Sequence, residues 1–242
     1  MFRRKRTARQ ESREKRGAIA RFAHDWVLPL LVAVVVLTPL RSSVADWNDV
    51  PTGSMRPTIL EGDRIFVNKL AFGLRVPLTK IWLAQWGGPD RGDIVTLASP
   101  RDGTRLVKRV IGVPGDEISL AGNRLAINGE PVEYAVVGAG TTVELPDGNF
   151  APIVLAEEAL PGRPHAVTFT QGVRSPRSFE TIVVPEGQYF VMGDNRDQSL
   201  DSRIFGFVKR GDVYGRSSYV AISFDPDGFL SPRFDRWFLR MQ

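Results

Sequence analysis

The feature that most constrains this chain is an uncharged apolar run near its N-terminus, WVLPLLVAVVVLTPL, from Trp26 to Leu40. A helix that crosses the hydrocarbon core of a bilayer needs ~20 mostly apolar residues. The run reaches that length if it continues past Arg41, whose long side chain extends toward the interface, to about Trp47. Tryptophan at both ends suits the two interfaces. The sequence therefore predicts a transmembrane anchor over residues 26–46.

The charge of the chain lies almost entirely before this run. Residues 1–25 hold nine Lys/Arg and three acids, a net charge of +6, whereas the whole chain carries only +5. Basic flanks stay on the cytoplasmic side of a membrane, so we expect a cytoplasmic tail over 1–25 and an extracytoplasmic domain over 47–242. A protein that binds nucleic acid would instead carry a basic patch on its folded body, and no nucleic-acid partner is predicted.

Two alternatives to an anchor remain open. A cleavable signal peptide has the same order of charge and apolar residues, and Ser43-Val44-Ala45 fits its small-x-small cleavage pattern. The basic segment is long for a signal peptide, which favours the uncleaved anchor. A buried core helix is the other alternative, but fifteen uncharged residues behind a basic tail argue against it.

The chain after residue 50 has the pattern of a β protein. Gly-Asp turns precede apolar strands in EGDRIFVNKL, RGDIVTLASP, PGDEISLAG and RGDVYGRSS, and an Asn-Gly turn joins two more runs in NRLAINGEPVEY. We predict a mostly β fold, an antiparallel β-sheet or partly open barrel. Residues 117–185, rich in Gly and Pro, are expected to be a β-rich insertion.

Helices are predicted at only two places in this body. One is a short helix near residues 81–86. The other is the C-terminal stretch SPRFDRWFLRMQ, where Phe234, Trp237, Phe238 and Met241 recur at helical spacing and the arginines fall between them. Such a helix suits either an anionic lipid surface or docking on the domain itself, and the spacing does not choose between them.

The residue types present limit the catalytic chemistry. The chain has no cysteine and two histidines, so thiol catalysis and histidine-rich metal sites are excluded. His24 precedes the anchor, and His165 lies in the expected insertion, where a structural role is predicted. A serine nucleophile would therefore need a base other than histidine. Ser54, in VPTGSMRPTIL directly after the anchor, is the candidate nucleophile.

A lysine can serve as that base if burial lowers its pKa toward neutrality. Lys108 lies in the apolar run TRLVKRVIGVPGD, where a strand places it on one face with Leu106 and Val110 and Arg109 on the other. Lysine is rarely buried without a partner or a function. The alternative is an edge-strand lysine that prevents aggregation, and the pattern alone does not separate the two.

A third polar stretch, MGDNRDQSLDSRIFG, follows the apolar strand QYFV. Its alternating charges and hydroxyls indicate a hydrogen-bonded loop. The alternatives are a solvated turn or a calcium loop. The acids at 194, 197 and 201 lack EF-hand spacing, and two arginines would repel a cation.

Taken together, these stretches resemble the bacterial type I signal peptidases, or leader peptidases, which are membrane-bound Ser-Lys endopeptidases. PTGSMRPT is similar to the nucleophile motif of that family, RGDIV to its next strand motif, KRVIGVPGD to its lysine motif and GDNRDQSLDSR to its C-terminal motif. All four occur in the family's order. Threonine stands at Thr52 where many members have serine, and Gln198 replaces a frequent asparagine.

The resemblance implies roles for particular residues. Ser54 would be the nucleophile and Lys108 the general base, with the Ser54 backbone N–H and the Thr52 hydroxyl as oxyanion donors. Ser199 would orient Lys108. Asp201 and Arg203 would form an ion pair that braces the loop, with Asp194 and Arg109 in support. The residues expected to line shallow pockets for small side chains at −1 and −3 of the scissile bond are Val50, Met55, Ile59, Leu106 and Val107.

The resemblance also implies partners and a location. The substrates would be signal peptides of exported preproteins, cleaved near the export translocase and in contact with membrane lipid. No metal or cofactor is expected. The enzyme would lie in the bacterial cytoplasmic (inner) membrane, with a single span and its catalytic domain on the periplasmic side. Other possibilities are a membrane-anchored β-rich binding or assembly protein without catalysis, and a cytosolic Ser-Lys repressor-type protease.

Overall fold

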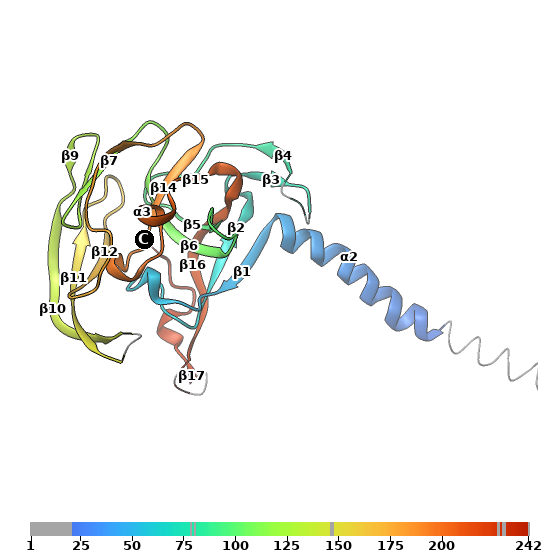
Figure 1. The fold of residues 1–242 in the computed structure, drawn as a ribbon. Coiled ribbons are helices and arrows are strands. Elements are labelled where there is room, and N and C mark those ends of the chain that lie inside the picture. The colour runs from blue at the N-terminus through green and yellow to red at the C-terminus, as the bar shows by residue number, and fades with distance from the viewer. Residues whose placement is uncertain are drawn as a thin grey trace, which may run out of the picture.

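The computed structural model describes residues 21–77, 79, 81–145, 148–226, 228 and 231–241. Most of the predicted basic tail, residues 1–20, lies outside them. The described chain is a β body from which one long helix projects (Figure 1).

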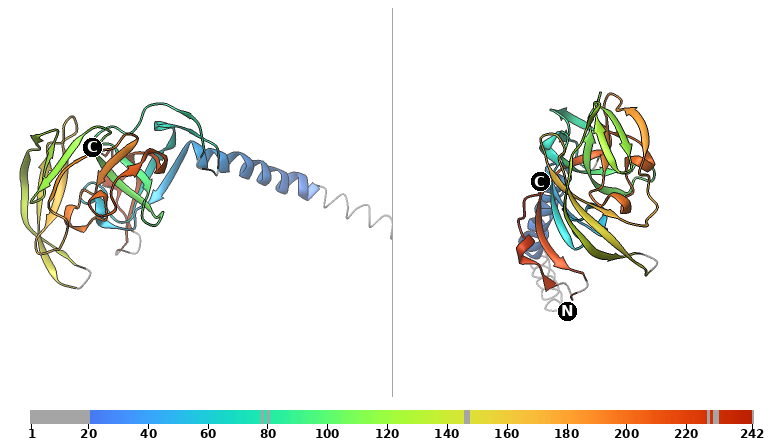
Figure 2. Two further views of the ribbon diagram at one scale, coloured as in Figure 1. Left: turned by 45° about the horizontal axis from the view of Figure 1, so that its top comes forward. Right: turned by 90° about the vertical axis from the view of Figure 1, so that its left-hand side faces the viewer.

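The projecting helix is the predicted anchor. A π-helical turn, Ala23–Val27, leads into α2, Leu28–Ser43. The stretch His24–Ser43 is 20 residues long and apolar enough to cross a membrane by length and composition. Its leucines and valines from Leu28 to Leu37 are exposed, and the helix points away from the body in the left-hand view of Figure 2. An apolar helix without protein neighbours is expected for a lipid-facing span.

The helix ends three residues before the predicted end of the anchor. Residues Ala45–Asp49 form strand β1, which pairs with β2, Asp63–Asn68. Trp47 therefore lies on a strand opposite Phe66 and not on the last turn of a longer helix.

One curled antiparallel sheet forms the half of the body nearest α2 (Figure 1). The sequence prediction of a mostly β, partly open barrel is confirmed. The spatial order of its strands is β1, β2, β16 (Val213–Asp225), β5 (Ile94–Ala98), β6 (Arg105–Gly112), β14 (Gln188–Met192) and β15 (Val208–Lys209), with β17 (Ser231–Pro232) paired to β16.

The predicted insertion forms two sheets of its own at the end of the body away from α2 (Figure 1). The first contains β13 (Phe179–Val183), β7 (Glu117–Ala121), β8 (Arg124–Ile127) and β9 (Glu130–Pro131), in that order. The second contains β10 (Tyr134–Glu144), β11 (Phe150–Glu158) and β12 (His165–Thr170). A single parallel bridge, Thr168 to Asn195, joins β12 to the loop after β14.

The prediction of a short helix at residues 81–86 is wrong. This segment is strand β4, Trp82–Gln85, paired with β3, Gly73–Arg75. The Arg75 guanidinium lies 4.1 Å from the centre of the Trp82 ring, so Trp82 makes a cation–π contact with the neighbouring strand.

The prediction of a C-terminal helix is also wrong beyond its first turn. A 3-10 turn covers only Phe234–Arg236, and Phe238 has φ +56°, which a helix does not allow. Phe234 and Phe238 remain exposed whereas Met241 is buried, so the four residues share no common face. The backbone here pairs with β16, and this pairing outweighs the local helical spacing.

The remaining helices are single turns. They are Gly53–Met55, Lys69–Ala71, Arg196–Gln198, α3 (Ser202–Phe205) and Arg210–Asp212. Two of them carry candidate site residues.

Candidate active site

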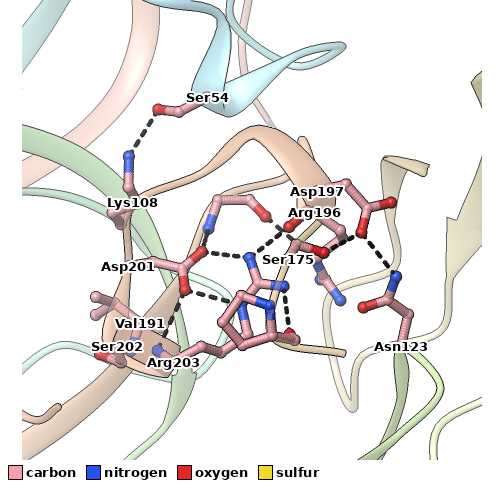
Figure 3. Close-up of polar contacts among 12 residues, drawn as sticks. Ser54, Lys108, Asn123, Ser175, Val191, Arg196, Asp197, Asp201, Ser202 and Arg203 are labelled. Atoms are coloured by element: carbon pink, nitrogen blue, oxygen red, sulfur yellow. Dashed lines mark hydrogen bonds and ion pairs between the residues drawn. The ribbon is translucent and has the colours of Figure 1, made fainter. Parts of the chain in front are cut away.

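Ser54 and Lys108 are brought into contact by the fold. Ser54 lies on the 3-10 turn Gly53–Met55, and Lys108 lies on β6. The Lys108 Nζ donates to Ser54 Oγ at 2.6 Å (Figure 3). It also donates to the Val107 carbonyl oxygen at 2.9 Å. A serine hydroxyl within hydrogen-bond reach of an amine is the arrangement required of a nucleophile and its base.

Lys108 lies in the interior of the sheet, which rules out the edge-strand alternative. Strand β6 has β5 on one side and β14 on the other. Only 2% of the Lys108 surface is exposed. Its cross-strand partner is Val95, and the apolar cluster on this face includes Val95, Leu106 and Val110. The sequence had placed these last two on the face of Lys108.

This burial sets the electrostatics of the lysine. Removal from water disfavours the ammonium and lowers the pKa of Lys108 from 10.5 to about 8, although the carboxylates of Asp201 and Asp194 oppose the change. A substantial fraction of the amine is therefore neutral just above pH 7, as a general base requires.

The turn that carries Ser54 is fixed at both of its ends. The Ile59 amide donates to the Met55 carbonyl oxygen at 2.9 Å, and the Val50 amide donates to the carbonyl oxygen of Asp63 at 3.0 Å. Met55 and Ile59 are almost fully buried beneath the turn. This packing holds the serine in one place beside the sheet.

The loop after β14 closes over the same turn. Asn195 donates from its backbone N–H to the Ser54 carbonyl oxygen and from Nδ2 to the Gly53 carbonyl oxygen, both at 3.1 Å. Gly193 permits this approach, because a Cβ there would lie 2.4 Å from the Ser54 carbonyl oxygen. The sequence analysis did not single out Asn195 or Gly193, although both lie in the quoted C-terminal motif.

The predicted Asp201–Arg203 pair is present. The guanidinium contacts the carboxylate twice, Nε to Oδ1 at 2.8 Å and Nη2 to Oδ2 at 2.7 Å. The same carboxylate accepts from the Gly193 N–H at 3.0 Å and caps α3 at the Arg203 N–H (Figure 3). It therefore links the start of the loop to its end.

Arg109 and Asp194, expected only to support that loop, form a second ion pair, and neither side chain is exposed. Two hydrogen bonds of 2.9 and 2.8 Å join them. Burial works against the charged carboxyl, but the guanidinium outweighs it and holds the pKa of Asp194 below its usual range. Thr58 donates to the same carboxylate at 2.6 Å and so connects the pair to the segment after Ser54.

A second buried ionic group lies behind this pair and was missed by the sequence analysis. Arg196 Nη2 donates to Glu158 Oε1 at 2.8 Å, and the Tyr134 hydroxyl donates to Oε2 at 2.6 Å. His165 Nε2 is 3.5 Å from Glu158. Burial lowers the pKa of His165 to about 4, which keeps the ring neutral and suits the structural role predicted for it. No local pattern marks Glu158, since its partner lies in a distant loop.

The calcium-loop alternative is wrong. The three acids of the loop are each bound to arginine: Asp194 to Arg109, Asp197 to Arg177 and Asp201 to Arg203. Within the described residues, no group of three or more His, Asp or Glu is placed to hold a metal ion.

Two predicted site residues are near Ser54 without the expected hydrogen bonds. The Ser199 Oγ is buried and makes no hydrogen bond within the described structure, so the expected bond to Lys108 is not present. Thr52 precedes the turn with an exposed side chain and does not cap it.

The predicted pocket residues divide between two clusters. Val50, Met55 and Ile59 belong to one buried cluster, and Val107 packs against it. Leu106 instead packs with Val95 and Val110 on the face of Lys108. The alternation of β6 places Leu106 and Val107 on opposite faces of the strand.

The chain matches a known protein family over most of its length. The family model described as "Signal peptidase, peptidase S26" matches residues 23–222. Signal peptidase I of Pseudomonas aeruginosa is 34% identical over 221 residues, covering 86% of this chain and 75% of that protein. Signal peptidase I of Rickettsia canadensis is 35% identical over 224 residues, covering 84% of this chain and 78% of that protein.

The family match spans both the apolar helix α2 and the strands that lie next to Ser54 and Lys108. The resemblance drawn from four short motifs is confirmed at the level of the family. The chain belongs to the peptidase S26 family and is a signal peptidase of type I, a hydrolase that processes signal peptides.

Proposed function

We propose that this chain cleaves signal peptides by a Ser-Lys dyad, with Ser54 as the nucleophile and Lys108 as the general base. The observation that carries the proposal is the 2.6 Å contact between Lys108 Nζ and Ser54 Oγ, made by a lysine with a lowered pKa. Family membership supplies the substrate class and argues against a β-rich binding protein without catalysis.

The reaction starts when neutral Lys108 accepts the Ser54 hydroxyl proton. Oγ attacks the scissile carbonyl carbon, and a tetrahedral oxyanion forms. Its charge is stabilised by the Ser54 N–H and the Thr52 hydroxyl, a term typically worth ~3 kcal/mol per donor. Collapse breaks the C–N bond, and the Lys108 ammonium gives its proton to the leaving amine.

The acyl-enzyme on Ser54 is then hydrolysed. Neutral Lys108 takes a proton from water, and the resulting hydroxide attacks the ester carbonyl. The Oγ–C bond breaks, the proton returns to Oγ, and the signal peptide leaves as a carboxylate. The two arginine–carboxylate pairs, Asp201–Arg203 and Arg109–Asp194, hold the loop that presses on the serine turn. Ser199, whose buried hydroxyl makes no hydrogen bond in the described structure, would orient Lys108 as the resemblance implies.

The substrate preference follows from small apolar pockets. Val50, Met55, Ile59 and Val107 pack in one apolar cluster, Leu106 packs in another, and substrate pockets are proposed to form against these side chains. These pockets would admit small side chains at −1 and −3 of the scissile bond and exclude larger ones.

We also propose that the anchor stays attached. Cleavage after Ala45 would cut a junction that is part of the folded body. Asp46 accepts from Arg41 Nε at 2.9 Å and from Lys69 Nζ at 3.2 Å. Lys69 also donates to the Arg41 carbonyl oxygen at 3.0 Å. Such bonds across the helix end support a permanent connection.

The location follows from the anchor and the basic tail. The tail would remain in the cytoplasm of a bacterium and the β body would lie on the periplasmic side of the inner membrane, next to lipid and the export translocase. Ser54 then meets a scissile bond that emerges from the same membrane on a tethered helix. A cytosolic repressor-type protease would not need an apolar helix that is long enough to cross a membrane.

The test is cleavage of a preprotein with an Ala-x-Ala site in detergent by the wild type and by Ser54→Ala. A correctly positioned cut by the wild type alone supports both the nucleophile and the substrate. A cut that persists in Ser54→Ala would reject the serine mechanism. N-terminal sequencing of the purified chain would reveal cleavage after Ala45 if the anchor were removed.

A further inference from the structure

The last residues of the chain fold back onto the segment that carries the nucleophile, instead of forming the predicted helix. The segment concerned is 231–241, which we call the C-terminal strap. Arg236 donates from Nη2 to Asp63 Oδ2 at 2.6 Å and from Nε to Oδ1 at 3.1 Å. Asp63 is fully buried at the start of β2, where the loop from Val50 ends.

The same arginine reaches further into that loop. Arg236 Nη2 also donates to the Thr58 carbonyl oxygen at 3.2 Å, four residues after Ser54. Asp63 accepts from the Leu60 N–H at 2.9 Å, so the carboxylate joins the loop and the strap. One guanidinium thus connects the strap to both the middle and the end of the loop from Val50 to Asp63, which carries Ser54.

A second arginine of the strap, Arg233, makes the neighbouring contacts. It donates to the Ser223 Oγ at 2.8 Å and to the carbonyl oxygens of Phe224 at 2.9 Å and of Glu61. Its Nη2 lies 3.6 Å from Asp63. Two arginines therefore balance a single buried carboxylate, and both belong to the strap.

The backbone of the strap runs antiparallel to β16. Arg233 donates to the carbonyl oxygen of Ser223, and Val220 donates to that of Leu239, both at 2.9 Å. Met241 donates to the Ser218 carbonyl oxygen at 2.9 Å. The strap is thus held at both ends, and its final described residue is fixed in place.

Met241 ends inside the apolar cluster of the proposed substrate pockets. Its side chain is 8% exposed and packs with the cluster that contains Val50, Met55 and Ile59. In Figure 1 the C-terminus lies over the β body and away from α2. The strap therefore contacts the nucleophile segment twice, through Asp63 and through this cluster.

We propose that the C-terminal strap is a positioning element of the active site, in which Arg236 fixes the loop that presents Ser54 and Met241 limits the size of the side chain accepted at −1 or −3. The specificity part of this proposal rests on the proposed function. The positioning part rests on the contacts alone. Neither Arg236 nor Met241 touches the reacting atoms.

The first experiment measures the loop without using activity. Amide hydrogen exchange by mass spectrometry is compared for the full chain, Arg236→Gln and Arg240→Gln in detergent. Arg240 is an exposed arginine of the same strap and serves as the matched control. We expect amides of residues 53–63 to exchange at least about tenfold faster in Arg236→Gln and to remain unchanged in Arg240→Gln.

Unchanged protection of residues 53–63 in Arg236→Gln would overturn the positioning role, whatever the enzyme does to a preprotein. If Arg236→Gln fails to fold, Arg236→Lys keeps a charge near Asp63 and is compared in the same way. The lysine variant should restore part of the protection, since it lacks only the paired geometry of the guanidinium.

The second experiment measures selectivity as a ratio, which does not depend on the fraction of folded enzyme. Two preproteins with Ala or Val at −1, and a second pair varied at −3, compete for the wild type, Met241→Ala and Leu239→Ala. Leu239 is a partly exposed neighbour outside the cluster and serves as the control. We expect Met241→Ala to raise the relative kcat/KM for Val at one of these positions about tenfold.

An unchanged ratio at both positions in Met241→Ala would overturn the specificity role while leaving the dyad mechanism intact. Failure of the wild type to cleave either preprotein would reject the proposed function and, with it, the specificity role. The exchange result would still decide the positioning role, so the two failures are distinguishable.

Discussion

The backbone N–H of Asn195 donates a hydrogen bond of 3.1 Å to the carbonyl oxygen of Ser54, so the loop after β14 rests directly on the nucleophile turn. Both arginine–carboxylate pairs of the loop act on this contact. Asp201 holds the Gly193 N–H, and Asp194 joins Arg109 to Thr58. Burial of these charges is tolerated because each carboxylate has a guanidinium and further donors.

The close approach of the loop predicts that Gly193→Ala inactivates the enzyme. A Cβ at this position would lie 2.2 Å from Ser199 Oγ and 2.4 Å from the Ser54 carbonyl oxygen, so one of them must move. We expect kcat to fall at least about tenfold, because small displacements of catalytic groups are costly. Gly211→Ala, with no atom within 4 Å of the added carbon, is the control. Full activity of Gly193→Ala would mean that the contact with Ser54 is unimportant.

Replacement of the base separates charge from function. Lys108→Arg keeps a cation in the site but cannot present a neutral amine, since arginine stays protonated. We expect cleavage to fall by at least about 10²-fold, the lower range for a general base. Lys209→Arg, on an exposed position, should leave the rate unchanged. Circular dichroism checks that both variants fold, and a folded, active Lys108→Arg would reject the lysine base.

The pKa of Lys108 predicts the pH dependence. The amine must be neutral to act, so kcat/KM should rise with pH and level off above an apparent pKa of about 8. Rates are measured from pH 6 to 10 with the substrate well below KM. A profile that levels off below pH 6 would place the essential group elsewhere.

The same pKa has a consequence for stability. Between pH 8 and 10.5 the unfolded chain holds more protons at this lysine than the folded chain, so the free energy of unfolding should rise with pH across that window through this group. Lys108→Met should remove this part of the slope, as followed by denaturant unfolding at several pH values. An identical slope in the variant would show that Lys108 is not the titrating group.

The proposed oxyanion donor is tested by removing a hydroxyl from a solvent-exposed side chain. Thr52→Ala should lower kcat about 10²-fold with little change in KM, because the hydroxyl acts only on the charge of the transition state. Thr52→Ser keeps the donor and should retain activity. A raised KM with unchanged kcat in Thr52→Ala would point to ground-state binding instead.

The buried ion pair predicts a loss of stability. Arg109→Met leaves Asp194 charged and fully enclosed, which should reduce the free energy of unfolding by about 3–5 kcal/mol. Arg64→Met, which removes an exposed ion pair with Asp49, should cost less than about 1 kcal/mol. Denaturant unfolding of the detergent-solubilised chain measures both.

The double variant Arg109→Met with Asp194→Leu provides the internal check on that interpretation. It removes the unpaired charge together with its partner, so it should be more stable than Arg109→Met alone. The losses in free energy of unfolding of Arg109→Met and of Asp194→Leu can also be added. If the double variant loses as much as this sum, the loss does not arise from an uncompensated charge.

The sequence alone determined the features that depend on local chemistry. An uncharged run of this length predicts a helix wherever it lies, and Gly-Asp turns between apolar runs predict antiparallel strands. Ser54 and Lys108 were singled out because a hydroxyl after the anchor and a lysine on an apolar strand face are unusual. The Asp201–Arg203 pair was expected from the family resemblance of the C-terminal motif.

The tertiary structure decided what depends on distant partners. The predictions of a helix at residues 81–86 and of a long C-terminal helix were wrong. The first segment pairs with β3 and the second with β16, and this pairing satisfies more backbone groups than a short exposed helix would. Glu158 carries no local signal and acquires its role only when Arg196, Tyr134 and His165 close around it. Met241 follows an arginine at the end of the chain, and only the pairing of its backbone with Ser218 places its side chain beside Met55. Spacing fixes which face of a strand or helix a residue occupies, but the contacts between elements far apart in sequence are fixed by how those elements pack.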